Sequence, residues 1–212
     1  MTEPNSMPES RAERLALLVA GLACALASSA AFWLHMLNLV RMPYFINFVG
    51  YPAIVLMLVL GVYSWKHELS FWHRLRAGLV GGAAGLLAYD GIRFGVYSLH
   101  LFEFYPFVTH RIFGYLITGE PLESTASAIA GWTYHFWNGF SFAIIYALIA
   151  GGARWYWGLA WAMILEVAML FTYPTYLDIN FNLGFVLLSL VGHGAYGIAL
   201  GLTVSRMVGE DE

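Results

Sequence analysis

Long apolar runs separated by short polar or turn segments dominate the chain. Six runs can be marked, at approximately 15–39, 46–65, 77–97, 126–149, 156–174 and 182–204. Each is close to the roughly 20 residues that an α-helix needs to cross a hydrocarbon core of about 30 Å. The pattern therefore predicts an all-α fold, a polytopic integral membrane bundle of six transmembrane helices.

The segments between the runs predict the rest of the layout. We expect a disordered tail at 1–13, one transmembrane domain at 14–206 and an acidic tail at 207–212. The stretch KHELSFWHRLR at 66–76 predicts a compact basic loop, and GGAR at 151–154 a tight turn. The aromatic segment 98–125 contains Pro106 and Pro121, so we expect an interfacial anchor on the outer side or a lid over an outward-facing cavity.

Basic residues predict the orientation of the bundle. If the N-terminus is cytoplasmic, seven of the ten lysines and arginines lie on that side: Arg11, Arg14, Lys66, Arg74, Arg76, Arg154 and Arg206. The other side holds Arg41 and Arg111, while Arg93 lies within a run. Since cytoplasmic loops carry the excess of positive charge, both termini are expected in the cytoplasm.

Composition agrees with a membrane protein. Hydrophobic residues make up 60% of the chain and charged residues 11%, against about 45–50% and about 25% in soluble domains. A net charge of −3 argues against a nucleic-acid partner, because there is no basic stripe to neutralise phosphates. The expected partners are membrane lipid and a hydrophobic small molecule, and the expected location is a bacterial plasma membrane, crossed several times. The oligomeric state stays open.

Five charged or histidine residues interrupt the last four apolar runs: Asp90, Arg93, His135, Glu166 and His193. Each costs about 2.5–3.5 kcal/mol at the centre of a membrane helix, so such groups normally face the bundle interior and find partners. At about 1.5 Å per residue, the four other than Arg93 lie about 10–17 Å below the outer ends of their helices. They are expected to share one layer, in which Glu166, within WAMILEVAMLF, needs a partner from another helix.

Neighbouring polar residues extend this candidate site. Arg93 is placed to pair with Asp90, and Asn138 shares a helix face with His135. Ser189 and Tyr196 flank His193 on one face, and these four neighbours are the predicted substrate-binding residues. His135 and His193 each begin a His-x3-Gly-x3-small stripe, so hairpins 3–4 and 5–6 of the six helices are possible relatives.

The chemistry of this set leaves three alternatives. Glu166, Asp90, His135 and His193 are the candidate catalytic groups of a membrane-embedded enzyme acting on a lipid, isoprenoid or quinone. They would bind a divalent metal (Zn, Fe or Mn) or, without metal, use Glu166 as a general acid. The same groups suit a proton- or metal-ion-coupled transporter, or His135 and His193 could ligate a haem.

Other histidines are expected at the outer interface. His35, His100 and His110 lie near it with Glu103, as polar caps or as a metal entry site.

Overall fold

The chain folds into seven consecutive helices in the computed structural model, which describes residues 9–101, 104–177 and 182–209. They are α1 (Arg11–Met36), the continuous helix Met42–Lys66, α4 (Ser70–Ser98), α5 (Val108–Thr118), α6 (Thr125–Ala150), α7 (Tyr156–Leu177) and α8 (Leu183–Gly209). Met42–Lys66 consists of α2 (Met42–Phe45), the π-helical turn η1 (Ile46–Gly50) and α3 (Tyr51–Lys66). No strand occurs in these ranges. The all-α prediction is confirmed, and the count of six helices is wrong.

The seventh helix, α5, arises within the segment 98–125. Pro106 and Pro121 both lie outside it, so neither removes one of its hydrogen bonds. It ends at Gly119, which has φ 75°, a conformation that glycine adopts without strain. The prolines therefore delimit a short helix between them.

The basic loop expected at 66–76 is much shorter than predicted, because α4 already begins at Ser70. Phe71 and Leu75 are buried in the core, and the Ser70 N–H donates to a Glu9 carboxylate oxygen at 3.2 Å. The apolar face of this stretch thus packs as helix, and a carboxylate from the N-terminal segment caps its first turn.

The first helix begins before the expected end of the N-terminal tail. α1 begins at Arg11, where the Ser10 hydroxyl accepts from the Glu13 N–H at 3.1 Å. The expected tails at 1–13 and 207–212 fall partly outside the described residues, which begin at Glu9 and end at Gly209. The tight turn at 151–154 is confirmed, with Gly151 at φ 53° between α6 and α7.

Four helices are long and apolar enough to cross a membrane: Arg11–Met36, Met42–Lys66, Tyr156–Leu177 and Leu183–Gly209. The predicted runs 77–97 and 126–149 are helical, in α4 and α6, but these helices are not among the four. Large apolar side chains such as Phe48 and Phe171 are more than three-quarters exposed on the outside. Extensive outward apolar surface is rare on soluble monomers and is typical of a membrane protein.

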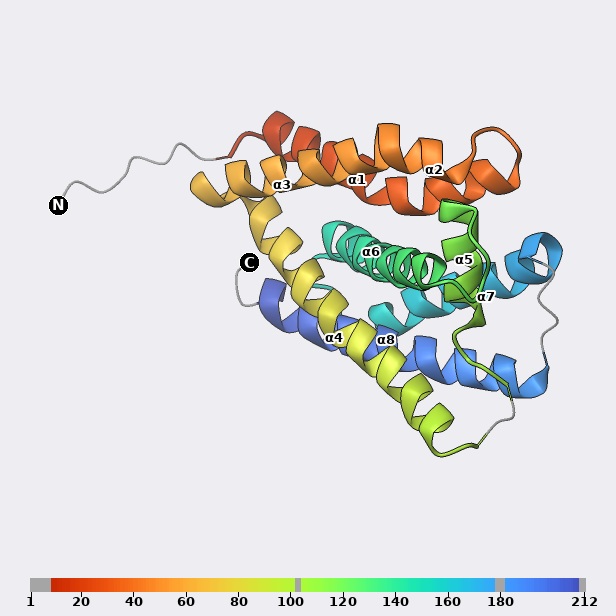
Figure 1. Cartoon of the computed structure of the whole chain (residues 1–212). Coiled ribbons are helices and arrows are strands. Elements are labelled where there is room, and N and C mark those ends of the chain that lie inside the picture. The colour runs from red at the N-terminus through yellow and green to blue at the C-terminus, as the bar shows by residue number, and fades with distance from the viewer. Residues whose placement is uncertain (1–8, 102–103, 178–181, 210–212) are drawn as a thin grey trace.

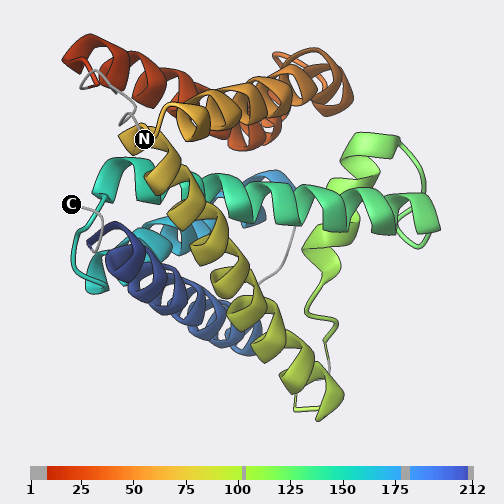
Figure 2. The ribbon, with the colours of Figure 1, turned by 90° about the vertical axis from the view of Figure 1, so that its left-hand side faces the viewer.

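The helices surround α6. α1 and α3 pack together on one side of it, while α4 contacts it from the other side and crosses α8 (Figure 1). α7 packs along α8, and α5 packs against one end of α6, as the second view shows (Figure 2). Both described chain ends lie at the same end of the bundle as the α3–α4 and α6–α7 turns (Figure 1). The middle of α6 is therefore enclosed by helices from both halves of the chain.

Candidate functional site

The four predicted catalytic residues lie in the interior as two carboxylate–imidazole pairs. Asp90 of α4 places Oδ2 3.0 Å from Nε2 of His135 on α6. Glu166 of α7 places Oε2 2.7 Å from Nδ1 of His193 on α8. The four groups therefore form two pairs, one between α4 and α6 and one between α7 and α8.

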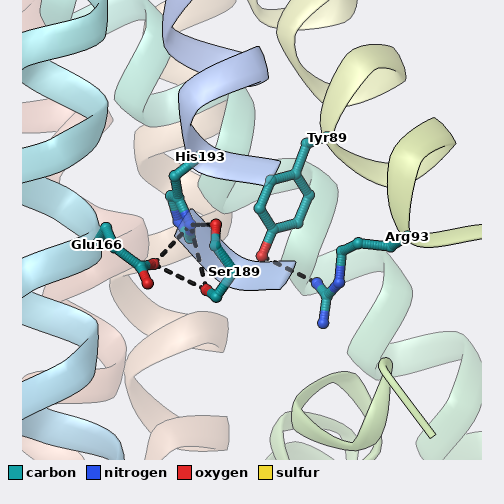
Figure 3. A network of polar contacts seen from close by, with 5 residues as sticks. All are labelled: Tyr89, Arg93, Glu166, Ser189 and His193. Carbon is teal, nitrogen blue, oxygen red and sulfur yellow. Dashed lines mark hydrogen bonds and ion pairs between the residues drawn. The ribbon is translucent and has the colours of Figure 1, made fainter. Parts of the chain in front are cut away.

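Glu166 is completely buried and obtains its partners from α8 (Figure 3). Its Oε2 accepts from the Ser189 hydroxyl at 2.8 Å as well as facing His193. Oε1 is buried and has no hydrogen-bond partner in the described part of the chain. Glu166 was expected to need a partner from another helix, and its Oε2 has two partners on α8, Ser189 and His193.

The carboxylates determine which imidazole nitrogens are available for chemistry. A carboxylate accepts the N–H of a neutral imidazole, so the other ring nitrogen keeps its lone pair. The nitrogen left over is Nε2 in His193 and Nδ1 in His135. Both imidazoles are about 15% exposed, whereas Glu166 is fully covered. In each pair the imidazole is thus more exposed than the carboxylate.

The two histidine stripes lie at helix contacts, as their small residues predict. A Cβ placed on Gly139 would come within 2.5 Å of Leu86 on α4, and one on Gly197 within 2.6 Å of Ala162 on α7. Each stripe therefore packs against the helix that carries the acid of the same pair. The common origin of the two hairpins stays a prediction.

Tyr89 connects the two pairs. Its ring centroid lies 5.8 Å from that of His135 and 4.9 Å from that of His193. Arg93 donates to the Tyr89 hydroxyl at 2.9 Å (Figure 3) and to the Pro106 carbonyl. Arg93 is therefore directed to Tyr89 and Pro106, and Asp90 to His135, instead of to each other.

A cavity of about 260 Å³ lies in front of the imidazoles. His135, His193, Tyr89, Asn138 and Tyr196 line it, together with apolar side chains of α1, α4, α6 and α7. Asn138 Oδ1 is buried without a hydrogen-bond partner in the described ranges. Of the four predicted substrate-binding residues, Asn138 and Tyr196 line the cavity. Arg93 and Ser189 do not line it, but they contact the lining residues Tyr89 and His193.

His110 joins the Asp90–His135 pair. Asp90, His110 and His135 each offer a ligand atom within 4.8 Å of the others. His110 is 3% exposed and stacks on Trp132, with ring centroids 4.4 Å apart. Burial lowers the pKa of His110 well below its ordinary value, and the charges of His135 and Arg93 act in the same direction.

The expectation of an interfacial cap at His110 is therefore wrong. A Cβ on Gly131 of α6 would overlap the His110 carbonyl, so only a glycine lets α5 approach this closely. The spacing of small residues on α6 was visible in the sequence, but the fold-back of α5 was not. Of its expected neighbours, His35 and His100 remain outside the site, and Glu103 lies outside the described residues.

Sequence reasoning also missed Tyr89 and the part of α1 that covers the cavity. Tyr89 directly precedes Asp90, so its neighbour was the available signal. Ser29, Phe32 and Trp33 come from an ordinary apolar run, in which no residue stands out. The polar groups could be found because placing them in a membrane costs free energy, whereas the apolar walls of the cavity carry no such signal.

Comparison with known proteins gives a family without a known activity. Residues 72–212 match the family described as "Family of unknown function (DUF6789)", and the chain belongs to this family. No curated protein and no solved structure matches. The matched range includes both carboxylate–imidazole pairs, Tyr89, Arg93 and His110, while α1 to α3 precede it.

Proposed function

We propose that this member of the DUF6789 family is a membrane-embedded enzyme that performs acid–base chemistry on a hydrophobic small molecule. A lipid, an isoprenoid or a quinone fits the apolar walls of the cavity. One observation carries the proposal: the Glu166 carboxylate holds Nδ1 of His193, whose other nitrogen remains available in an imidazole that lines the cavity.

His193 is the proposed general base. A carboxylate on one imidazole nitrogen selects the tautomer, fixes the ring and stabilises the imidazolium formed when the other nitrogen takes a proton. Because Glu166 is fully buried, water does not weaken this interaction. Glu166 and Ser189 are then positioning residues that act through His193.

Tyr89 and Asn138 are the proposed binding groups for a polar head. Arg93 donates to the Tyr89 oxygen, so the phenolic hydrogen remains free to bind a substrate oxygen. Asn138 adds a cavity-lining amide whose carbonyl oxygen is unpaired in the described chain. A volume of about 260 Å³ lies just below the roughly 300–1,000 Å³ of typical ligand sites, which favours a head group or single ring over a whole lipid.

The enzyme proposal is tested by conversion of extracted lipids. Purified protein in nanodiscs is incubated with a total lipid extract and followed by mass spectrometry. The wild type should consume at least one compound and Glu166→Gln should not. Glu120→Gln, the same change at an exposed carboxylate, is the matched control and should behave as wild type. An extract unchanged by the wild type would refute the proposal.

A proton-coupled transporter is the second candidate. The two carboxylate–imidazole pairs on either side of the Tyr89 ring support it, because acid and histidine side chains inside a membrane can relay protons. Substrate-dependent proton flux into liposomes, lost in Glu166→Gln, would favour it. Bis-histidine haem is supported least, since the Tyr89 ring contacts both imidazoles.

We propose a multi-pass topology in a bacterial plasma membrane, with six spans and cytoplasmic termini. α4 and α6 would join the four apolar helices as spans, because their polar groups face the interior and pair there. The position of both chain ends beside the α3–α4 and α6–α7 turns supports this orientation (Figure 1). Cysteine accessibility at His67→Cys and Glu120→Cys tests it, since these exposed positions should be labelled from opposite sides.

A further inference from the structure

We infer that Asp90, His110 and His135 bind a divalent first-row transition metal ion, zinc or ferrous iron. This site goes beyond the proposed acid–base function of His193 and does not depend on it. It also differs from the four-residue metal site expected from the sequence, because His110 takes part while Glu166 and His193 form a separate pair.

The donor atoms have the spacing that one ion requires. They come from α4, α5 and α6 and lie within 4.8 Å of one another. Metal–ligand bonds of about 2.0–2.2 Å place neighbouring ligand atoms roughly 3 Å apart. Asp90 Oδ2 and His135 Nε2 are already 3.0 Å apart, and a metal ion would replace the proton of the hydrogen bond between them. Small side-chain rotations would thus complete the coordination.

Two buried atoms in this group have no other partner. Asp90 Oδ1 and His110 Nδ1 are both inaccessible and make no hydrogen bond within the described residues. Buried polar atoms are normally satisfied, so an unpaired oxygen and an unpaired nitrogen in one cluster indicate a missing ligand. A cation accounts for both, because each offers a lone pair.

The donor types select the class of ion. Two imidazoles and one carboxylate form the three-ligand set of catalytic zinc sites and of non-haem ferrous sites. Both leave a position open for water or substrate.

The positive charge of Arg93 lies near the cluster, and its contacts direct it elsewhere. Its guanidinium donates to Tyr89 and Pro106 and lies over the rings of Tyr89 and Phe107, 4.9 and 5.1 Å from their centroids. The positive charge of Arg93 still disfavours a metal cation nearby. An ion bound here is therefore expected to carry hydroxide or an anionic substrate group in its open position.

Metal titration of the whole protein tests the inference. Protein purified with a histidine-free tag and stripped with chelator is titrated with Zn²⁺ or, without oxygen, Fe²⁺, and bound metal is measured by mass spectrometry. Wild type should bind one ion, and His110→Gln at least ten times more weakly. His193→Gln and the exposed-imidazole control His100→Gln should bind as wild type. Equal binding by His110→Gln, or binding of neither ion by wild type, would overturn the site.

Cobalt substitution keeps the test decisive if His110→Gln does not fold. The visible spectrum of Co²⁺ bound to wild type should show the intensity of a four- or five-coordinate nitrogen–oxygen site. A spectrum of hydrated Co²⁺ would refute the inference. Failure of the metal site and failure of the proposed function are distinguishable, because the latter is read from lipid conversion in Glu166→Gln.

Discussion

Glu166 and His193 form a buried carboxylate–imidazole pair across the α7–α8 interface, with Oε2 2.7 Å from Nδ1. Replacing Glu166 by Gln keeps the volume but places a neutral amide against both His193 and Ser189. One hydrogen bond of the pair becomes weaker or reversed, so we expect a destabilisation of about 1–3 kcal/mol. Any activity should fall at least about 100-fold, because His193 loses its tautomer control.

Thermal unfolding in detergent and the lipid-conversion assay measure the two effects of Glu166→Gln separately. Glu120→Gln lies on the surface and should change neither quantity. A Glu166→Gln protein as active as wild type would remove His193 as the proposed base.

Ser189→Ala tests whether the serine, histidine and glutamate act as a nucleophilic triad. In such a triad the serine contacts the nitrogen opposite the carboxylate. Here Ser189 lies 3.5 Å from Nδ1, the nitrogen that faces Glu166, and donates to the carboxylate itself. We therefore expect no labelling of wild type by fluorophosphonates and at most a tenfold loss of activity in Ser189→Ala. Labelling at Ser189 would show that it is a nucleophile.

Much of the fold can be predicted from the sequence, because the free energy of placing a residue in a membrane depends mainly on the type of that residue. The run 156–174 corresponds to Tyr156–Leu177, and 46–65 to Met42–Lys66. Depth counting predicted a shared layer for Asp90, Glu166 and the two histidines, and the structure shows that all four side chains are at most 16% exposed. Depth does not say which way a side chain points, however. The rotation of each helix about its axis determines that the four groups form two separate pairs.

The contact of α5 with α6 could not be predicted in this way. His110 reaches Asp90 and His135 only because an aromatic segment between two prolines folds back onto Gly131. No periodicity in one helix specifies such a tertiary contact.

Gly131→Ala tests this close approach. The added methyl group would overlap the His110 carbonyl, so α5 must shift, and we expect about 1–3 kcal/mol of destabilisation. Metal affinity should fall with it, because His110 moves away from Asp90. Gly95→Ala on α4 is the matched control, since nothing lies within 4 Å of its Cβ. It should be neutral or stabilise by up to about 1 kcal/mol.

Arg93→Lys should loosen the start of α5. The guanidinium donates at once to Tyr89 and Pro106, two groups that a single ammonium reaches poorly. We expect faster hydrogen exchange in the first turn of α5, with α7 and α8 unchanged. Lys66→Arg, a conservative exchange of basic residues at the end of α3, is the control. Unchanged exchange in α5 would show that Arg93 does not hold this segment.

Tyr89→Phe separates the metal site from the chemistry at His193. The ring that contacts both imidazoles is kept, and only the hydroxyl that accepts from Arg93 is lost. Because no metal donor changes, the protein should bind the same amount of Zn²⁺ as wild type. Lipid conversion should fall about 10- to 100-fold, since the substrate oxygen loses a hydrogen-bond donor. Loss of metal together with activity would show instead that the ring position, and with it the Asp90–His135 pair, depends on the Arg93–Tyr89 hydrogen bond.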